Sequence, residues 1–156
     1  MTKKSEALPV EKTAAVSLVE DSIGDVVLTK AIMKSENIVF DLTVYRDGAE
    51  IVEFLTNCPK PNHPDLILLD FNMPKISGVE VLRFMQSQKL THIPVLMMTG
   101  SEATQDRELT QELGAAGFLL KPLNLQQLAE AIEPLINLRF ANQDDQWRLL
   151  SSKEQA

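Results

Sequence analysis

Short apolar runs alternate with helix-periodic segments along this chain. The runs have the length of strands, and we predict β-strands at residues 14–19, 42–45, 65–70, 94–98 and 117–120. Each run is followed by a segment with apolar positions at helical spacing. We predict helices from residue 23 onward and at residues 49–56, 78–88, 103–113 and 125–136. This alternation predicts an α/β domain whose parallel sheet is covered by helices on both faces.

A chain of 156 residues with this pattern is expected to form a flavodoxin-like (βα)5 doubly wound parallel sheet with strand order 2-1-3-4-5. The first and third strands are neighbours in that order. Ligands of such sheets bind at the carboxyl ends of the strands, beside the point where the strand order reverses. That edge is therefore where we expect functional side chains.

Local signals mark two of the helices. The Ser-x-x-Asp spacing of Ser22 and Asp25 is typical of a capping box and predicts a helix start near Ile23. Ile23 and Val27 then recur at the interval of one helical face. In the last helix, Pro134 removes a backbone donor and clashes with the preceding turn, so we predict a kink or break between residues 130 and 134.

We expect a flexible N-terminal extension at residues 1–13, a folded domain at 14–140, and a C-terminal tail at 141–156 that is too short for an output domain. The tail carries Trp147, Leu149 and Leu150. A tryptophan in a polar tail either folds back on its own domain or is buried against a partner. The sequence leaves both options open, and a contribution of the tail to a homodimer is our hypothesis.

The net charge of −7 argues against nucleic acid as a direct partner, because phosphate binding needs a basic face. No apolar run has the length of a membrane span, and the first residues lack the apolar core of a signal peptide. Cys58 is the single cysteine, which excludes an internal disulfide. We expect a cytoplasmic protein with no membrane partner.

Carboxylates end the two strands that the fold makes neighbours. The first strand is followed by Glu20 and Asp21, and the buried run Leu-Ile-Leu-Leu of the third ends in Asp70. Carboxylates this close repel one another unless a cation neutralises them. Mg²⁺ suits such a site, because it binds one or two carboxylates, keeps several waters and bridges to phosphate oxygens. The alternative is that Glu20 and Asp21 only cap the first helix.

A hydroxyl and an ammonium are expected at the same edge. Thr99 follows the fourth strand and Lys121 the fifth. With the acids, these side chains form a set suited to stabilising a transferring phosphoryl group, where positioning and charge neutralisation dominate. The sequence has no glycine-rich phosphate loop, and neither His63 nor His92 pairs with a serine or cysteine nucleophile.

This constellation resembles the receiver domain of two-component response regulators, also called CheY-like. The matching positions, in order, are Glu20-Asp21, Asp70, Met73-Pro74, Gly78, Thr99 and Lys121-Pro122. The resemblance covers about residues 14–138. It implies that Asp70 accepts a phosphoryl group from a histidine kinase, and that such a protein promotes its own phosphorylation and dephosphorylation without being a classified enzyme.

The resemblance also implies a ligand set. Asp21 and Asp70 would bind Mg²⁺ directly together with the backbone carbonyl of Asn72, and Glu20 would act through water. Lys121 would pair with the phosphoryl group, and its bond to Pro122 would be cis.

The resemblance implies a conformational switch at Thr99 and Phe118. The alternative for Phe118 is that it is an ordinary core aromatic. The signal would leave through the surface of the fourth helix, fifth strand and fifth helix. The residues 20–25, 46–50 and 54–55 are similar to stand-alone, single-domain receivers that serve phytochrome-type kinases.

Two other functions remain as alternatives. A phosphorylation-independent binding module could keep this fold, although such proteins usually lose the acid pair, the phosphoacceptor or the lysine. A metal-dependent phosphatase using Asp70 as nucleophile would need a second acid two residues later, where this chain has Asn72.

Overall fold

The computed structural model describes residues 10–100 and 104–153, with the backbone alone at 104–106. Its centre is a five-stranded parallel sheet in the order β4-β2-β5-β6-β7. The strands are β2 (Ala15–Val19), β4 (Asp41–Tyr45), β5 (Leu66–Asp70), β6 (Val95–Thr99) and β7 (Gly117–Leu120). This order confirms the predicted 2-1-3-4-5 topology. Every residue of β5 and β6 is buried, which explains their continuous apolar sequence.

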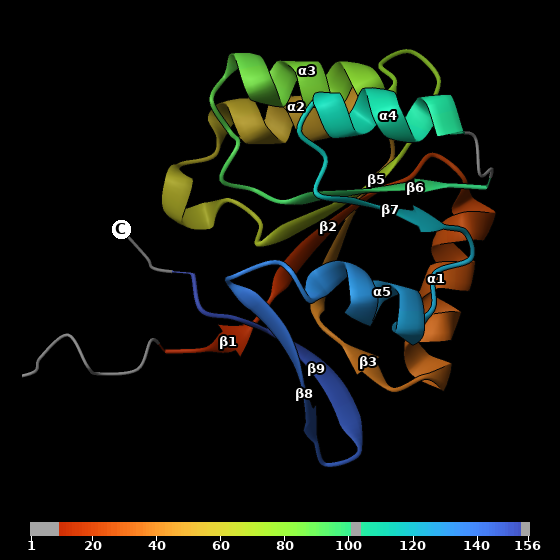
Figure 1. The fold of residues 1–156 in the computed structure, drawn as a ribbon, viewed down its shortest axis with the longest axis vertical. Coiled ribbons are helices and arrows are strands. Elements are labelled where there is room, and N and C mark those ends of the chain that lie inside the picture. The colour runs from red at the N-terminus through yellow and green to blue at the C-terminus, as the bar shows by residue number, and fades with distance from the viewer. Residues whose placement is uncertain (1–9, 101–103, 154–156) are drawn as a thin grey trace, which may run out of the picture.

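Helices cover both faces of this sheet (Figure 1). One face carries α2 (Gly48–Asn57), α3 (Gly78–Ser87) and α4 (Thr104–Glu112), and the other carries α1 (Ile23–Ser35) and α5 (Leu125–Ile132). A short 3-10 helix, Lys60–Asn62, precedes β5. Alternate strand residues feed two separate cores, one beneath α2 and α3 and one beneath α1 and α5. The expected helix start at Ala103 lies outside the described residues.

Ile23 and Val27 do lie on one face of α1, and this face points to solvent. Ile23 is 64% exposed and Val27 61% exposed. Val26 and Met33 pack against the core instead, and Thr29 is buried. The four-residue spacing of Ile23 and Val27 therefore marks an exposed apolar stripe on α1.

The last helix breaks where proline predicts it. α5 ends at Ile132, Glu133 caps it, and Pro134 follows, so the expected break between residues 130 and 134 is confirmed. The expected helical continuation to residue 136 is wrong. Ile136 lies outside the helix and is 94% exposed.

A second, smaller sheet joins parts of the two expected terminal segments to residues of the folded domain. It contains β1 (Lys12–Thr13), β3 (Ile38–Val39), β8 (Leu138–Gln143) and β9 (Gln146–Ser151). β9 pairs antiparallel with β8 along its full length. On its other side it pairs antiparallel with β1 and parallel with β3. Asp144 and Asp145 both have positive φ, 56° and 64°, as a two-residue type I′ hairpin turn requires.

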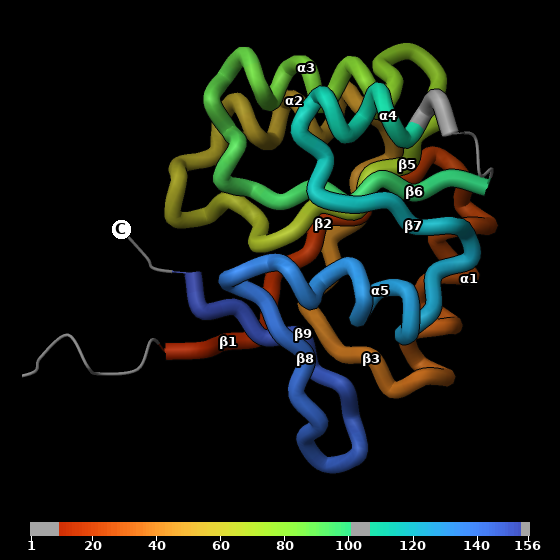
Figure 2. The backbone as a smooth tube through the Cα atoms, in the orientation of Figure 1, coloured from red at the N-terminus to blue at the C-terminus, as the bar shows by residue number. Residues whose placement is uncertain are grey.

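The hairpin projects from the body of the domain at its tip and joins the core at its base (Figure 2). Leu138 is 6% exposed and Leu149 is fully buried, and both belong to the core beneath α1 and α5. The expected C-terminal tail thus folds back on its own domain as far as Ser151, which is one of the two options that the sequence left open. Lys12 and Thr13, expected in the flexible extension, form β1. Burial in β9 rises from the tip to the base: Gln146 and Trp147 are exposed, whereas Leu149, Leu150 and Ser151 are all buried.

Among the residues that the structure describes, no helix combines the length and the apolar character that crossing a membrane requires.

Candidate functional site

The carboxyl ends of β2 and β5 bring the predicted acids together. The two strands pair in parallel with Val19 beside Leu69, so Glu20 and Asp70 end at the same edge. One carboxylate oxygen from each of Glu20, Asp21 and Asp70 lies within 4.8 Å of the others. Glu20 is 2% and Asp70 4% exposed, whereas Asp21 faces solvent. The site is thus a buried acid pair with an open third acid.

Burial dominates the electrostatics of Glu20. The pKa of this carboxyl is raised to about 7: burial is the largest cause, the neighbouring Asp70 adds to the rise, and Lys121 opposes it. A buried carboxylate with its pKa near neutrality lacks enough positive charge around it. A divalent cation bound by these oxygens would supply that charge.

Lys121 brings a positive charge to the three acids. Its Nζ lies 2.7 Å from Glu20 Oε1, 3.0 Å from Asp25 Oδ2 and 3.3 Å from Asp70 Oδ1. Burial works against the charged form, but the hydrogen bonds to Glu20 and Asp25 outweigh it and raise the pKa of Lys121. The bond between Lys121 and Pro122 is cis, as the family resemblance implied.

Sequence analysis missed Asp25 as a member of this site. Its spacing from Ser22 predicted a cap, and Ser22 Oγ does accept a hydrogen bond from the Asp25 N–H at 3.2 Å. The Asp25 carboxylate, however, reaches across to Lys121. The available signal was position: Asp25 lies in the first turn of the helix that follows β2, and Lys121 directly follows β7 at the same edge of the sheet.

Thr99 and Phe118 lie on one face of the sheet. Thr99 ends β6 and is 1% exposed, and its carbonyl accepts a hydrogen bond from the Lys121 N–H at 2.7 Å. Phe118 pairs with Met97, which lies two residues before Thr99 on β6. Since side chains two residues apart on a strand share a face, Phe118 and Thr99 face the same side of the sheet. The guanidinium carbon of Arg107, on α4, lies 5.0 Å from the centroid of the Phe118 ring. Phe118 is half-buried in this position.

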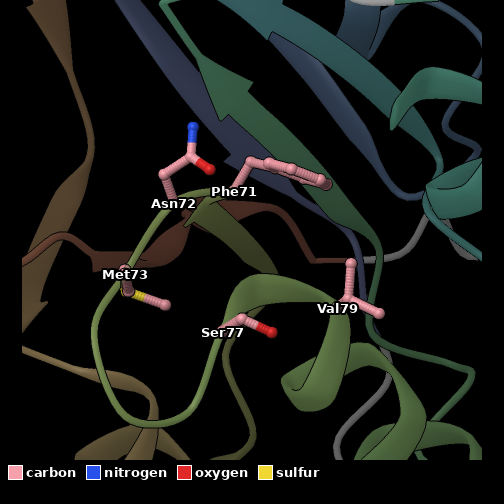
Figure 3. A pocket seen from close by; sticks show the side chains of 5 residues that line it. All are labelled: Phe71, Asn72, Met73, Ser77 and Val79. Carbon is pink, nitrogen blue, oxygen red and sulfur yellow. The ribbon is translucent and has the colours of Figure 1, made fainter. Parts of the chain in front are cut away.

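The loop after β5 shapes the remaining side of the site. Asn72 donates its N–H to Asp70 Oδ1 at 3.2 Å and its side chain is exposed. A cavity of about 440 Å³ opens between this loop and the start of α3. Figure 3 shows Asn72 pointing away from the loop and Met73 pointing into it. At the start of α3, a Cβ on Gly78 would lie 2.6 Å from the Asp70 carbonyl oxygen, so only glycine fits there.

Comparisons with known proteins agree with this geometry. The family model of the response regulator receiver domain matches residues 16–133. Response regulator Rcp1 of Synechocystis is 37% identical over 125 residues, which make up 76% of this chain and 83% of Rcp1. The polar-differentiation response regulator DivK of Brucella ovis is 28% identical over 117 residues, covering 68% of this chain and 95% of DivK.

Two solved structures show the same relationship. The bacteriophytochrome response regulator AtBRR matches with a TM-score of 0.69 and 34% identity, over 80% of this chain and 93% of that one. The Mn²⁺-bound form of Rcp1 matches with a TM-score of 0.61 and 34% identity, over 79% of this chain and 94% of that one.

Proposed function

This chain belongs to the family of response regulator receiver domains, and we propose that it accepts a phosphoryl group on Asp70 from a histidine kinase in a phosphorelay. The observation that carries the proposal is the buried Asp70 carboxylate, held beside two further acids and 3.3 Å from the Lys121 ammonium. The family as a whole works in two-component signalling. Asp70 as the acceptor in this chain is the specific part of the proposal.

We propose Mg²⁺ as the cofactor. Asp21 and Asp70 would bind it directly with the Asn72 backbone carbonyl, and Glu20 would bind through water. The oxygens within 4.8 Å of one another and the raised pKa of Glu20 support this assignment. The relative Rcp1 has been solved in a Mn²⁺-bound form. When bound, the ion would neutralise charge between the carboxylates and the phosphoryl oxygens.

The residues of this chain have distinct parts in the transfer. An Asp70 oxygen attacks phosphorus and forms a P–O bond, while the bond from phosphorus to the donor breaks and its electron pair leaves with the donor group. Lys121 donates a hydrogen bond to a phosphoryl oxygen, and its positive charge offsets the added negative charge. Thr99 would donate its hydroxyl to another phosphoryl oxygen from the neighbouring strand.

Phe118 would report this event at the surface. Movement of Thr99 toward the phosphoryl group would leave space on the face that it shares with Phe118, and the ring would turn inward. The half-buried ring and its contact with Arg107 of α4 support this role, because the turn would separate them and alter the surface of α4, β7 and α5.

The partner kinase is expected to be of the phytochrome type, in line with the resemblance to Rcp1 and AtBRR. The exposed apolar stripe of α1 supports docking beside the phosphoacceptor. Ile23, Val27 and Leu28 are 64%, 61% and 46% exposed, and α1 also carries Asp25 of the site. A cytoplasmic location stays a prediction.

We also propose a homodimer that uses the surface of α4, β7 and α5 together with the hairpin. Within the described chain, β8 pairs with β9 alone, so its other edge can accept a strand. Trp147 near the tip is 37% exposed. Sedimentation of wild type and Trp147→Ala tests this contact, with a dimer expected to weaken in the variant. A wild-type chain that stays monomeric at every concentration contradicts it.

The test of the function is intact mass after incubation with acetyl phosphate, for wild type and Asp70→Asn, with Mg²⁺ or with EDTA. We expect one phosphoryl adduct that requires both Mg²⁺ and Asp70. An adduct that survives in Asp70→Asn contradicts the assignment. If neither acetyl phosphate nor a purified histidine kinase gives an adduct, the phosphorylation-independent binding module becomes the better account.

A further inference from the structure

The ammonium of Lys121 is surrounded by acids whose number matches its donors. A lysine ammonium has three N–H donors and no acceptor. Here Glu20 Oε1 lies at 2.7 Å, Asp25 Oδ2 at 3.0 Å and Asp70 Oδ1 at 3.3 Å. The two shorter contacts occupy two donors. The third donor is left for Asp70, which is the acid that changes during the proposed reaction.

Asp25 differs from the other two acids. Its side chain is 42% exposed, whereas the side chains of Glu20 and Asp70 are 2% and 6% exposed. It is also not part of the group of described acids whose oxygens could share a metal ion. Its one recorded side-chain partner among the described residues is Lys121. Asp25 therefore acts on the lysine and has no place in the proposed ligand set.

The backbone of Asp25 is held in place. It lies in the first turn of α1, where Ser22 Oγ accepts its N–H. The far end of the same helix is tied to α5, because Glu36 Oε1 accepts the Leu125 N–H at 2.7 Å. The helix that carries Asp25 is therefore held at both ends by hydrogen bonds that do not involve Lys121, and the carboxylate reaches the ammonium from a fixed backbone position.

The lysine borders a space into which its ammonium can move. A cavity of about 170 Å³ lies between α1 and the segment after β7, lined by Glu20, Asp25, Leu28, Thr29, Lys121 and Leu123 among others. The lysine side chain has a flexible four-carbon stem with large rotamer freedom. Without Asp25, the ammonium could turn into this cavity and away from Asp70.

We propose that Asp25 is a positioning residue for phosphoryl transfer: it fixes the Lys121 ammonium so that its remaining N–H points at Asp70 and at the incoming phosphoryl group. This inference rests on the proposed function of Asp70 and adds a residue to it. Asp25 does not touch the reacting atoms, and its effect passes through Lys121.

Two variants separate positioning from charge. Asp25→Ala removes both the negative charge and the acceptor, whereas Asp25→Asn removes the charge and keeps an acceptor oxygen. Acetyl phosphate is an anion, so loss of a nearby negative charge would speed its reaction. If Asp25 positions the lysine, Asp25→Ala instead reacts more slowly than wild type, and Asp25→Asn restores the rate because it keeps the acceptor oxygen.

The experiment measures the rate of adduct formation by intact mass over a range of acetyl phosphate concentrations at saturating Mg²⁺. We expect Asp25→Ala to lower the maximal rate constant by about tenfold, with little change in the half-saturating donor concentration. Asp25→Asn is expected to stay within about threefold of wild type. Mg²⁺ affinity, measured by calorimetry, is expected to change by less than about twofold because Asp25 is not a ligand.

A second readout needs no phosphorylation. The NMR order parameter of the Lys121 side chain is expected to fall in Asp25→Ala and to be retained in Asp25→Asn. The inference is overturned if Asp25→Ala reacts at least as fast as wild type, or if the mobility of Lys121 is unchanged. Failure of the proposed function is a different result: wild type itself would form no adduct that depends on Asp70, and the inference would fall with it.

Discussion

Replacement of Leu149 by alanine tests whether the C-terminal hairpin is part of the folded core. Leu149 lies in β9, is fully buried and belongs to the same cluster as Leu128 and Leu138. Removing its outer carbons loses their transfer free energy and leaves a cavity, which costs about 3 kcal/mol in a well-packed core. This is a large share of the total stability of a domain, about 5–15 kcal/mol.

The assay is equilibrium unfolding in urea with linear extrapolation. For a slope m of about 1.5 kcal/mol/M, the loss corresponds to a midpoint about 2 M urea lower, with m itself unchanged. Ile136→Ala is the matched control, because Ile136 is 94% exposed and precedes the hairpin in the chain. Its substitution is expected to change the free energy of unfolding by less than about 0.5 kcal/mol.

If Leu149→Ala does not fold at all, Leu149→Met provides the measurement, with an expected loss under about 1.5 kcal/mol. The reasoning is refuted if Leu149→Ala is no less stable than Ile136→Ala. That result would mean that the hairpin contributes little to the core, and that residues 141 onward behave as the tail that the sequence suggested.

Three further substitutions have defined outcomes. Gly78→Ala would put a Cβ 2.6 Å from the Asp70 carbonyl oxygen and is expected to cost about 1–3 kcal/mol of stability. Gly24→Ala is the control, because its Cβ would meet no atom closer than 3.8 Å, and it is expected to be neutral or stabilising. Equal urea midpoints for the two variants would contradict this prediction. Ser77→Ala removes the capping box of α3 and is expected to cost about 1 kcal/mol in urea unfolding, so an unchanged midpoint would count against the cap. Burial is the main cause that lowers the pKa of His92, so this residue alone reduces stability as pH falls through about 6.5. The raised pKa of Glu20 acts in the opposite direction over the same window, so the effect of His92 is measured as the difference between wild type and His92→Gln. That stability difference is expected to shift in favour of His92→Gln as pH falls, and parallel pH profiles of the two proteins would exclude the effect.

The sequence could predict the central sheet and the side chains at the ends of its strands, because both follow from the regular alternation of strands and helices. Continuous apolar runs located the central strands, and parallel topology then placed their carboxyl ends together. Glu20, Asp70 and Lys121 could be assigned to one edge because each directly follows such a strand. The cluster at that edge has the composition expected from those positions.

The buried face of α1, the second sheet and the role of Asp25 could not be predicted, because they depend on contacts between segments that residue spacing does not reveal. In α1, Ile23 and Val27 have the period of a buried face and lie on the surface, because Val26 and Met33 reach the core instead. The pairing of β9 with β1 and β3 joins segments over 100 residues apart in the chain, which no local pattern reveals. Asp25 carried a helix-capping signal that hid its contact with Lys121.

The central claim is that Asp70 carries the phosphoryl group, and chemical trapping tests it most directly. An aspartyl phosphate is an acyl phosphate, and borohydride reduces it to homoserine at the residue that carried it. After reaction with acetyl phosphate and Mg²⁺, reduction and peptide sequencing, we predict homoserine at position 70 alone. Homoserine at Asp21 or 5-hydroxynorvaline at Glu20 instead, or a phosphoryl adduct that leaves Asp70 unreduced, would contradict the account.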